Sequence, residues 1–178
     1  MKKDLESVMF DEETIAAKVA ELGQQIAKDY EGKDVVVVGI LNGAAVFFTD
    51  LIRQIKLPIN IDFIAASSYG DAAVSSGKVN IKKDLNKDIA GRHVLLVEDI
   101  IDSGITMNNL MALLRERKPA SIKLCALLSK PSRRQVDVNI DYCGFEVPDE
   151  FLVGYGLDYA EKYRNLPVIG VLKREIYS

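Results

Sequence analysis

The chain has 178 residues with a net charge of −3, and 48% of them are hydrophobic, which predicts one globular domain, residues 1–178, with a sizeable core. The acidic balance argues against nucleic acid or an anionic membrane as a partner, because both attract basic surfaces. No apolar run approaches the roughly 20 residues of a membrane span, and the single histidine, His93, argues against a zinc site or a Ser-His-Asp triad.

The first part of the chain alternates helical and strand-like patterns. Asp11 is a candidate N-cap for a helix that continues to about Ile26, since apolar residues there keep helical spacing. A buried strand at 35–40, the Asn42-Gly43 turn and a helix through 47–55 follow, and this order predicts a parallel sheet. The amides of the turn could bind an anion at the strand end. An ordinary strand-to-helix loop is the simpler alternative.

A strand pattern at 59–65 leads into small polar residues, 67–78, and a strand pattern resumes at Val79. The polar stretch offers little apolar area for burial, so we expect a mobile loop, although a plain linker would look the same. Strands on both sides of it would pair back as an antiparallel hairpin beside the parallel sheet.

The most informative stretch runs from Val94 to Thr106. Its first four residues are apolar, as in a strand buried on both faces, and Met107 begins an apolar helical stripe that continues to about Lys118. Between them, Glu98 and Asp99 stand at the carboxyl end of the strand, where open parallel sheets bind ligands.

The polar residues of this turn suit a sugar phosphate. Free amides at a helix N-terminus, beside the Ser103 and Thr106 hydroxyls, suit a phosphate, and Gly104 permits a close approach. Glu98 and Asp99 would repel a phosphate but suit ribose hydroxyls or Mg²⁺. The alternative is that Asp102 and Ser103 only cap the helix and that the acids are solvated.

The last third of the chain adds one strand and an irregular end. A buried strand at 122–128 delivers Lys130 to the same edge of the sheet, where a solvated positive patch is the alternative. Residues 140–178 show short strands and turns without a long helix, which predicts a small hood over the sheet edge. Cys125 and Cys143 lack CxxC spacing, which predicts buried, reduced thiols and a cytoplasmic protein.

Residues 97–106, Val-Glu-Asp-Ile-Ile-Asp-Ser-Gly-Ile-Thr, resemble the phosphoribosyl pyrophosphate (PRPP) signature of type I phosphoribosyltransferases, and Glu-Asp-Ile-Ile-Asp-Ser-Gly is most similar to hypoxanthine phosphoribosyltransferases. The resemblance covers nearly the whole chain. It implies an α/β fold with a parallel sheet of about five strands flanked by helices. It also implies an antiparallel lid at about 67–80 and a hood formed by about 140–178 plus N-terminal residues.

The activity implied by the resemblance is Mg²⁺-dependent transfer of the 5-phosphoribosyl group from PRPP to a 6-oxopurine. Hypoxanthine is the first expected acceptor and guanine the second, giving IMP or GMP and pyrophosphate in purine salvage. The resemblance further implies a homodimer or a homotetramer.

The resemblance also implies roles for individual residues. Asp102 is the implied catalytic residue, holding the proton at purine N7. PRPP is implied to contact Asn42, Gly43, Glu98, Asp99, Asp102, Ser103, Gly104, Ile105, Thr106 and Arg164. The purine is implied to meet Lys130 at its 6-oxo group, the Phe151 ring, the Leu152 backbone and Asp158. The implied Mg²⁺ ligands are Glu98, Asp99 and Asp158, and the implied lid residues are Ser68 and Tyr69. Many relatives have lysine where this chain has Asn42, so backbone groups would do more of the pyrophosphate binding here.

Two other functions fit parts of the pattern. A PRPP-sensing regulator on the same fold would keep the phosphate turn without base-binding residues such as Lys130, and turnover of hypoxanthine with PRPP would exclude it. A phosphoryl-transfer enzyme would need a phosphorylated nucleophile or a P-loop, and no GxxxxGK[ST] motif occurs.

Overall fold

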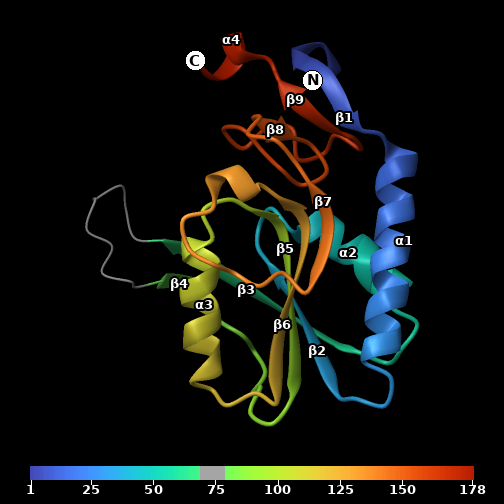
Figure 1. Ribbon diagram of the computed structural model, residues 1–178, viewed down its shortest axis with the longest axis vertical. Helices are drawn as coiled ribbons and strands as arrows, with labels where there is room; N and C mark the ends of the chain where they lie inside the picture. The colour runs from blue at the N-terminus through green and yellow to red at the C-terminus, as the bar shows by residue number, and fades with distance from the viewer. Residues whose placement is uncertain (69–78) are drawn as a thin grey trace.

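A computed structural model describes residues 1–68 and 79–178 of the chain. The expected lid residue Tyr69 lies outside the described residues, as does the side chain of Ser68. The elements in chain order are η1 (Lys2–Asp4), β1 (Leu5–Phe10), α1 (Glu12–Asp29), β2 (Val35–Ile40), α2 (Ala45–Gln54), β3 (Asn60–Ser68), β4 (Val79–Lys83), β5 (His93–Ile101), α3 (Ile105–Arg115), β6 (Ser121–Ser129), η2 (Pro131–Arg133), β7 (Tyr142–Glu146), β8 (Leu152–Val153), β9 (Ile169–Leu172) and α4 (Arg174–Tyr177) (Figure 1).

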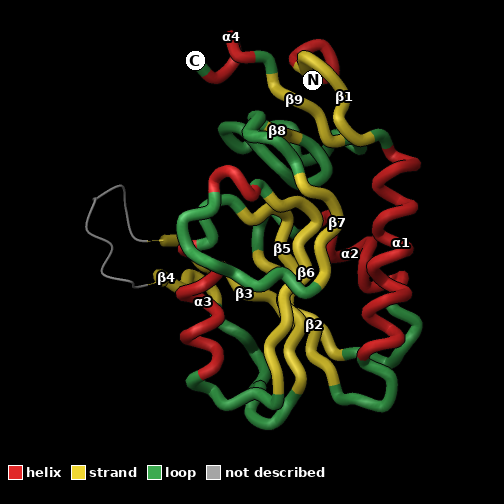
Figure 2. Tube along the Cα trace, in the orientation of Figure 1, coloured by secondary structure: helices red, strands yellow, loops and turns green. Residues whose placement is uncertain are grey.

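A six-stranded sheet in the order β4-β3-β2-β5-β6-β7 forms the body of the protein. Strands β3, β2, β5, β6 and β7 are parallel to one another, and β4 pairs antiparallel with β3 at the edge. The predicted parallel sheet of about five strands with an antiparallel element beside it is therefore confirmed. Figure 2 shows the strands running through the middle of the molecule with helices on either side.

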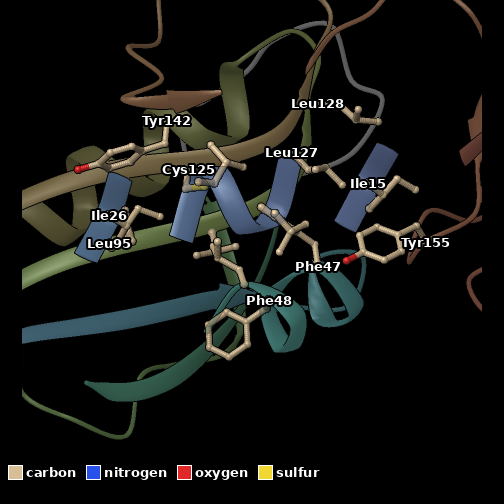
Figure 3. Close-up of a cluster of buried hydrophobic side chains, with 14 of the residues drawn as sticks. Ile15, Ile26, Phe47, Phe48, Leu95, Cys125, Leu127, Leu128, Tyr142 and Tyr155 are labelled. Atoms are coloured by element: carbon tan, nitrogen blue, oxygen red, sulfur yellow. The ribbon is translucent and has the colours of Figure 1, made fainter. Parts of the chain in front are cut away.

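Each face of this sheet has its own hydrophobic core. Successive residues of a strand point to opposite faces, so Leu95 and Val97 of β5 join a cluster with α1 and α2, whereas Val94 and Leu96 join a cluster with α3. Figure 3 shows part of the first cluster, in which Phe47 and Phe48 of α2 pack beneath the sheet. This two-sided burial explains why the parallel strands read as uninterrupted apolar runs.

The hood is a three-stranded antiparallel sheet in the order β1-β9-β8, at the end of the molecule where both termini lie (Figure 1). The N-terminal strand β1 pairs with β9, so the two ends of the chain build the hood together. The expected hood boundary near residue 140 differs from this arrangement, since β7 pairs in parallel with β6 in the main sheet. The buried Tyr142 side chain holds β7 there by donating a hydrogen bond to Asp29 of α1 at 2.7 Å.

Three local expectations differ from the structure. Helix α3 ends at Arg115 instead of about Lys118, because the chain turns there and Lys118 has a φ of 56°. Strand β5 continues to Ile101 because it pairs with β6 as far as Ser129, so Glu98 and Asp99 lie within the strand. Cys125 is buried as predicted, but Cys143 is exposed.

No helix within residues 1–68 or 79–178 combines the length and the apolar character that a membrane span needs.

Candidate functional site

The candidate site lies where the order of the parallel strands reverses. From β2 the chain moves to β3 on one side, and it later returns to place β5 on the other side of β2, followed by β6 and β7. The carboxyl ends of β2 and β5 therefore flank a switch point, where open α/β sheets bind their ligands. The Asn42-Gly43 turn follows β2, and Glu98 and Asp99 lie near the carboxyl end of β5.

A small pocket opens beside the end of β5 and the start of α3. It has a volume of about 240 Å³ and is lined by Glu98, Ile100, Ile101, Asp102, Ser103, Gly104, Thr106 and Met107. Ile105 is the first residue of α3, so the free amides of this helix start at the pocket. A partial positive charge at the helix N-terminus suits an anion of phosphate size.

The helix start is built without a side-chain cap. The N-cap residue is Gly104, with a φ of 81°, and it has no side chain that could cap the helix. A Cβ at Gly104 would also lie 2.9 Å from the Val138 side chain, so glycine is required both by conformation and by space. Of the two residues in the capping alternative, Ser103 accepts a hydrogen bond from the Ile105 amide at 3.3 Å, whereas Asp102 is not the N-cap residue.

Asp102 lies opposite Lys130 across the ends of two neighbouring strands. The Lys130 Nζ and Asp102 Oδ1 atoms are 3.8 Å apart, and the Lys130 side chain is 9% exposed whereas that of Asp102 is 51% exposed. The Lys130 amide donates to the Ile101 carbonyl at 3.0 Å, which fixes the lysine beside the turn. A buried ammonium group and an accessible carboxylate thus face one space.

Arg134 shapes the same turn and was not predicted from the sequence. Its guanidinium donates to the carbonyl of Asp102 at 3.0 Å and to the Ser129 hydroxyl at 2.8 Å. The amides of Gln135 and Val136 both donate to the Ser103 carbonyl. The segment after β6 therefore packs against the turn and supports it by hydrogen bonds. The pairing of β5 with β6 brings this segment next to the turn.

The two neighbouring carboxylates of β5 face different surroundings. Glu98 lines the pocket beside α3. Asp99 lies against Gly43, where any Cβ would overlap its carboxylate. Arg164 also lies near Asp99, and its positive charge lowers the pKa of Asp99, against the effect of burial. The structure therefore connects Asp99 with the turn after β2 and with the hood.

Burial makes both carboxylates hard to ionise. It raises the pKa of Glu98 well above the ordinary value of 4.5, and the charge of Asp99 raises that pKa further. Burial likewise raises the pKa of Asp99. A bound cation would offset the cost of holding these two charges close together.

Arg164 reaches the site from the hood. Its Nη1 atom donates to the Gly156 carbonyl at 2.8 Å, and its Nη2 atom lies 3.2 Å from Asp158 Oδ1. The other Asp158 oxygen accepts a hydrogen bond from the Glu161 amide at 2.9 Å. Arg164 and Asp158 are distant from the central turn in the sequence, but in the structure they lie together on the side of Asp99.

Phe151 belongs to an aromatic cluster of the hood. Its ring stacks on Tyr177 with centroids 4.6 Å apart and meets Tyr159 edge-on at 5.5 Å. Leu152 has a buried side chain in β8, the strand at one edge of the small sheet.

Within residues 1–68 and 79–178, no cluster of three or more His, Cys, Asp or Glu side chains is close enough to hold a metal ion. Mg²⁺ commonly takes one or two carboxylates and completes its shell with water and substrate phosphates. The half-buried Glu98 and Asp99 pair fits such a shared ion, whereas Asp158 is already engaged by Arg164 and the Glu161 amide.

Comparisons with known proteins agree with this geometry. Residues 9–160 match the family model described as the phosphoribosyl transferase domain. The chain is 52% identical over 178 residues to a hypoxanthine-guanine phosphoribosyltransferase of Bacillus subtilis, covering 100% of this chain and 99% of that protein. It is also 52% identical to part of the bifunctional protein TilS/HprT of Listeria monocytogenes, of which it spans 28% while all of this chain is covered. The crystal structure of a hypoxanthine phosphoribosyltransferase from Staphylococcus aureus superposes with a TM-score of 0.97 at 49% identity, covering 100% of this chain and 97% of the other.

Proposed function

The chain belongs to the phosphoribosyl transferase domain family, and we propose that it transfers the 5-phosphoribosyl group of PRPP to a 6-oxopurine. Hypoxanthine is the first acceptor and guanine the second, and the products are IMP or GMP and pyrophosphate. The relatives that carry hypoxanthine or hypoxanthine-guanine phosphoribosyltransferase as their name, at 49–52% identity, support this choice.

The pocket beside α3 supports the sugar-phosphate half of the proposal. Residues Asp102 to Thr106 would receive the 5′-phosphate, since the free amides of α3 and the Thr106 hydroxyl meet there. Glu98 and Asp99 would accept hydrogen bonds from the ribose hydroxyls. The Gly43 turn and Arg164 lie on the Asp99 side and would bind the pyrophosphate, with Asn42 contributing chiefly through its backbone.

The single observation that carries the choice of base is the buried Lys130 beside Asp102. A lysine only donates hydrogen bonds, so it matches a 6-oxo group and disfavours the 6-amino group of adenine. Asp102 would hold the proton at purine N7 and so assist attack by N9, the other nitrogen of the five-membered ring. Phe151 would stack on the base, and the Leu152 backbone would meet its edge.

The reaction needs stabilisation of separating charge. As pyrophosphate leaves, the ribose anomeric carbon becomes similar to an oxocarbenium ion, and the protein aligns the base with that carbon. When bound, Mg²⁺ would neutralise negative charge on the pyrophosphate. Glu98 and Asp99 would hold it, with Asp158 as a ligand of a second ion once Arg164 turns to the substrate.

The test is a panel of purine bases with PRPP and Mg²⁺, followed by nucleotide formation. We expect IMP from hypoxanthine, GMP from guanine and no product from adenine. Tight PRPP binding without turnover of any base would instead identify a PRPP-sensing regulator. Light scattering on the purified chain would test the expected homodimer or homotetramer.

A further inference from the structure

A hydrogen bond joins the hood to the helix that follows the Asn42-Gly43 turn. The hydroxyl of Tyr155 donates to Asp50 Oδ2 of α2 at 2.5 Å. Tyr155 is 7% exposed and belongs to the core cluster beneath the main sheet. Figure 3 shows this ring beside Phe47 of α2, so one hood residue is inserted into the body of the protein.

The residue after Tyr155 touches the turn itself. A Cβ at Gly156 would overlap the carbonyl oxygen of Gly43. Gly43 in turn lies directly against the Asp99 carboxylate. The loop between β8 and β9 (residues 154–168, the hood loop) therefore contacts the Asn42-Gly43 turn, and that turn contacts Asp99 of β5. A small movement of the hood loop would change the space at the turn.

Gly156 also holds Arg164 at two points. Its amide donates to the Arg164 carbonyl at 2.9 Å, and its carbonyl accepts from Arg164 Nη1 at 2.8 Å. The position of the Arg164 guanidinium thus depends on where Gly156 lies. Asp158 supports the same guanidinium from the other side.

The hood loop has an unusual backbone conformation, which contacts such as the Tyr155–Asp50 hydrogen bond help to hold. Gly154 and Gly156 have φ values of 100° and 99°, and Tyr155 between them has a φ of 51°, which is uncommon for a residue with a side chain. The Tyr155 amide donates to the Leu166 carbonyl at 2.8 Å. The hydrogen bond from the Tyr155 hydroxyl to Asp50 adds a polar link from the loop to α2.

We propose that Tyr155 and Asp50 are positioning residues for the pyrophosphate end of PRPP. Their hydrogen bond holds the hood loop on α2, so that the Gly43 turn and the Arg164 side chain face the same pyrophosphate from two sides. This inference rests on the proposed function and assigns the pair no contact with the substrate.

The chain offers a matched control for the test. Tyr142 also donates from a buried hydroxyl to an aspartate of a helix, Asp29 of α1, at 2.7 Å. Tyr142 and Tyr155 lie at opposite ends of the same cluster in Figure 3. The substitutions Tyr155→Phe and Tyr142→Phe therefore remove the same group from similar surroundings, and only the first is linked to Gly43 and Arg164.

The readouts are Kd for PRPP with Mg²⁺ by calorimetry, KM for pyrophosphate in the reverse reaction, KM for hypoxanthine, and Tm. We expect both variants to lower Tm by about 2–4 °C, the scale of one lost hydrogen bond. Tyr155→Phe should raise Kd for PRPP and KM for pyrophosphate roughly 3- to 10-fold, with KM for hypoxanthine within about twofold. Tyr142→Phe should leave all three constants unchanged.

A second variant guards against a purely structural effect. Asp50→Asn keeps an acceptor for the Tyr155 hydroxyl, so it should restore most of the pyrophosphate affinity that Asp50→Ala loses. Asp50 also forms an ion pair with the exposed Arg53 of α2, so Asp50→Ala removes two interactions. Asp50→Ala combined with Tyr155→Phe should therefore bind PRPP no more weakly than Asp50→Ala alone, because Tyr155 then has no Asp50 partner to lose.

Two results separate this inference from the proposed function. If the wild-type protein makes IMP but Tyr155→Phe binds PRPP and pyrophosphate as tightly as Tyr142→Phe does, the positioning role is wrong and the function stands. If the wild-type protein neither binds PRPP nor makes nucleotide, the proposed function fails and this inference fails with it.

Discussion

The Lys130 Nζ atom lies 3.8 Å from Asp102 Oδ1, with the lysine side chain buried and the aspartate open to solvent. The pair joins the ends of β5 and β6, two strands that pair in register from His93 opposite Ser121 to Ile101 opposite Ser129. A base entering this space would meet a fixed donor and a carboxylate together. Substitutions at Asp102 and at Lys130 would separate the roles of these two groups.

Asp102→Asn should lower kcat by roughly 10²- to 10⁴-fold, the usual contribution of general acid–base catalysis. The side chain keeps its size but loses the charge that would stabilise a proton on the base. Kd for PRPP should change little, because the turn around Asp102 is held through its backbone carbonyl by Arg134. Single-turnover nucleotide formation measures this, and an unchanged rate would remove Asp102 from the acid–base role.

Lys130→Ala should weaken binding of 6-oxopurines by about 1.5–3 kcal/mol, the range for a hydrogen bond to a charged group. Binding of PRPP should be almost unaffected. Lys123→Ala is the control, since Lys123 lies on β6, the strand that Lys130 follows, but over the rings of Tyr30 and Tyr142, each 5.8 Å from its Nζ atom. Loss of PRPP affinity without a change in base preference would instead assign Lys130 to the phosphate site.

Gly43→Ala should abolish most PRPP binding while the protein still folds. The new methyl group would overlap the Asp99 carboxylate, so either the turn or the acid must move. Gly91→Ala is a useful comparison, because Gly91 has a positive φ of 72° but no neighbouring atom within 4 Å of an added Cβ. Gly91→Ala should lower the free energy of unfolding by about 1 kcal/mol without loss of affinity for PRPP. Equal PRPP affinity in the two variants, measured by calorimetry, would contradict the contact.

Glu98→Gln should stabilise the free protein at neutral pH and reduce the stabilisation that PRPP and Mg²⁺ provide. The pKa of Glu98 is raised in the folded state by burial and by Asp99, so its contribution to stability is most favourable below its unfolded pKa, near 4.5, and is lost as pH rises through the folded pKa. The variant lacks this loss, and each pKa unit corresponds to about 1.36 kcal/mol.

Thermal unfolding at several pH values tests this prediction. The Tm of Glu98→Gln should equal that of the wild type below about pH 4 and exceed it increasingly at higher pH. Added PRPP and Mg²⁺ should raise the Tm of the wild type more than that of the variant. A variant that is less stable than the wild type at neutral pH would show that the Glu98 charge is already compensated in the free protein.

Much of the fold and part of the site follow from local sequence. The run Val35–Ile40 predicts β2, Asp11 does cap α1 by accepting from the Thr14 amide, and the apolar stripe from Met107 predicts α3. The acidic turn between β5 and α3 is likewise a local signal. These features are local because helix periodicity, capping and two-faced strand burial are set by residues only a few positions apart.

Only the tertiary structure decided which distant residues meet at that turn. Strand order brings Arg134 behind Asp102, the hood places Arg164 near Asp99, and Tyr155 reaches Asp50 across the core. No periodicity or spacing in the sequence encodes such pairs, because their distances depend on sheet pairing and on how the hood docks. The sequence by itself determined the elements and the chemistry of the central turn, whereas the packing of remote segments decided how that chemistry is held in position.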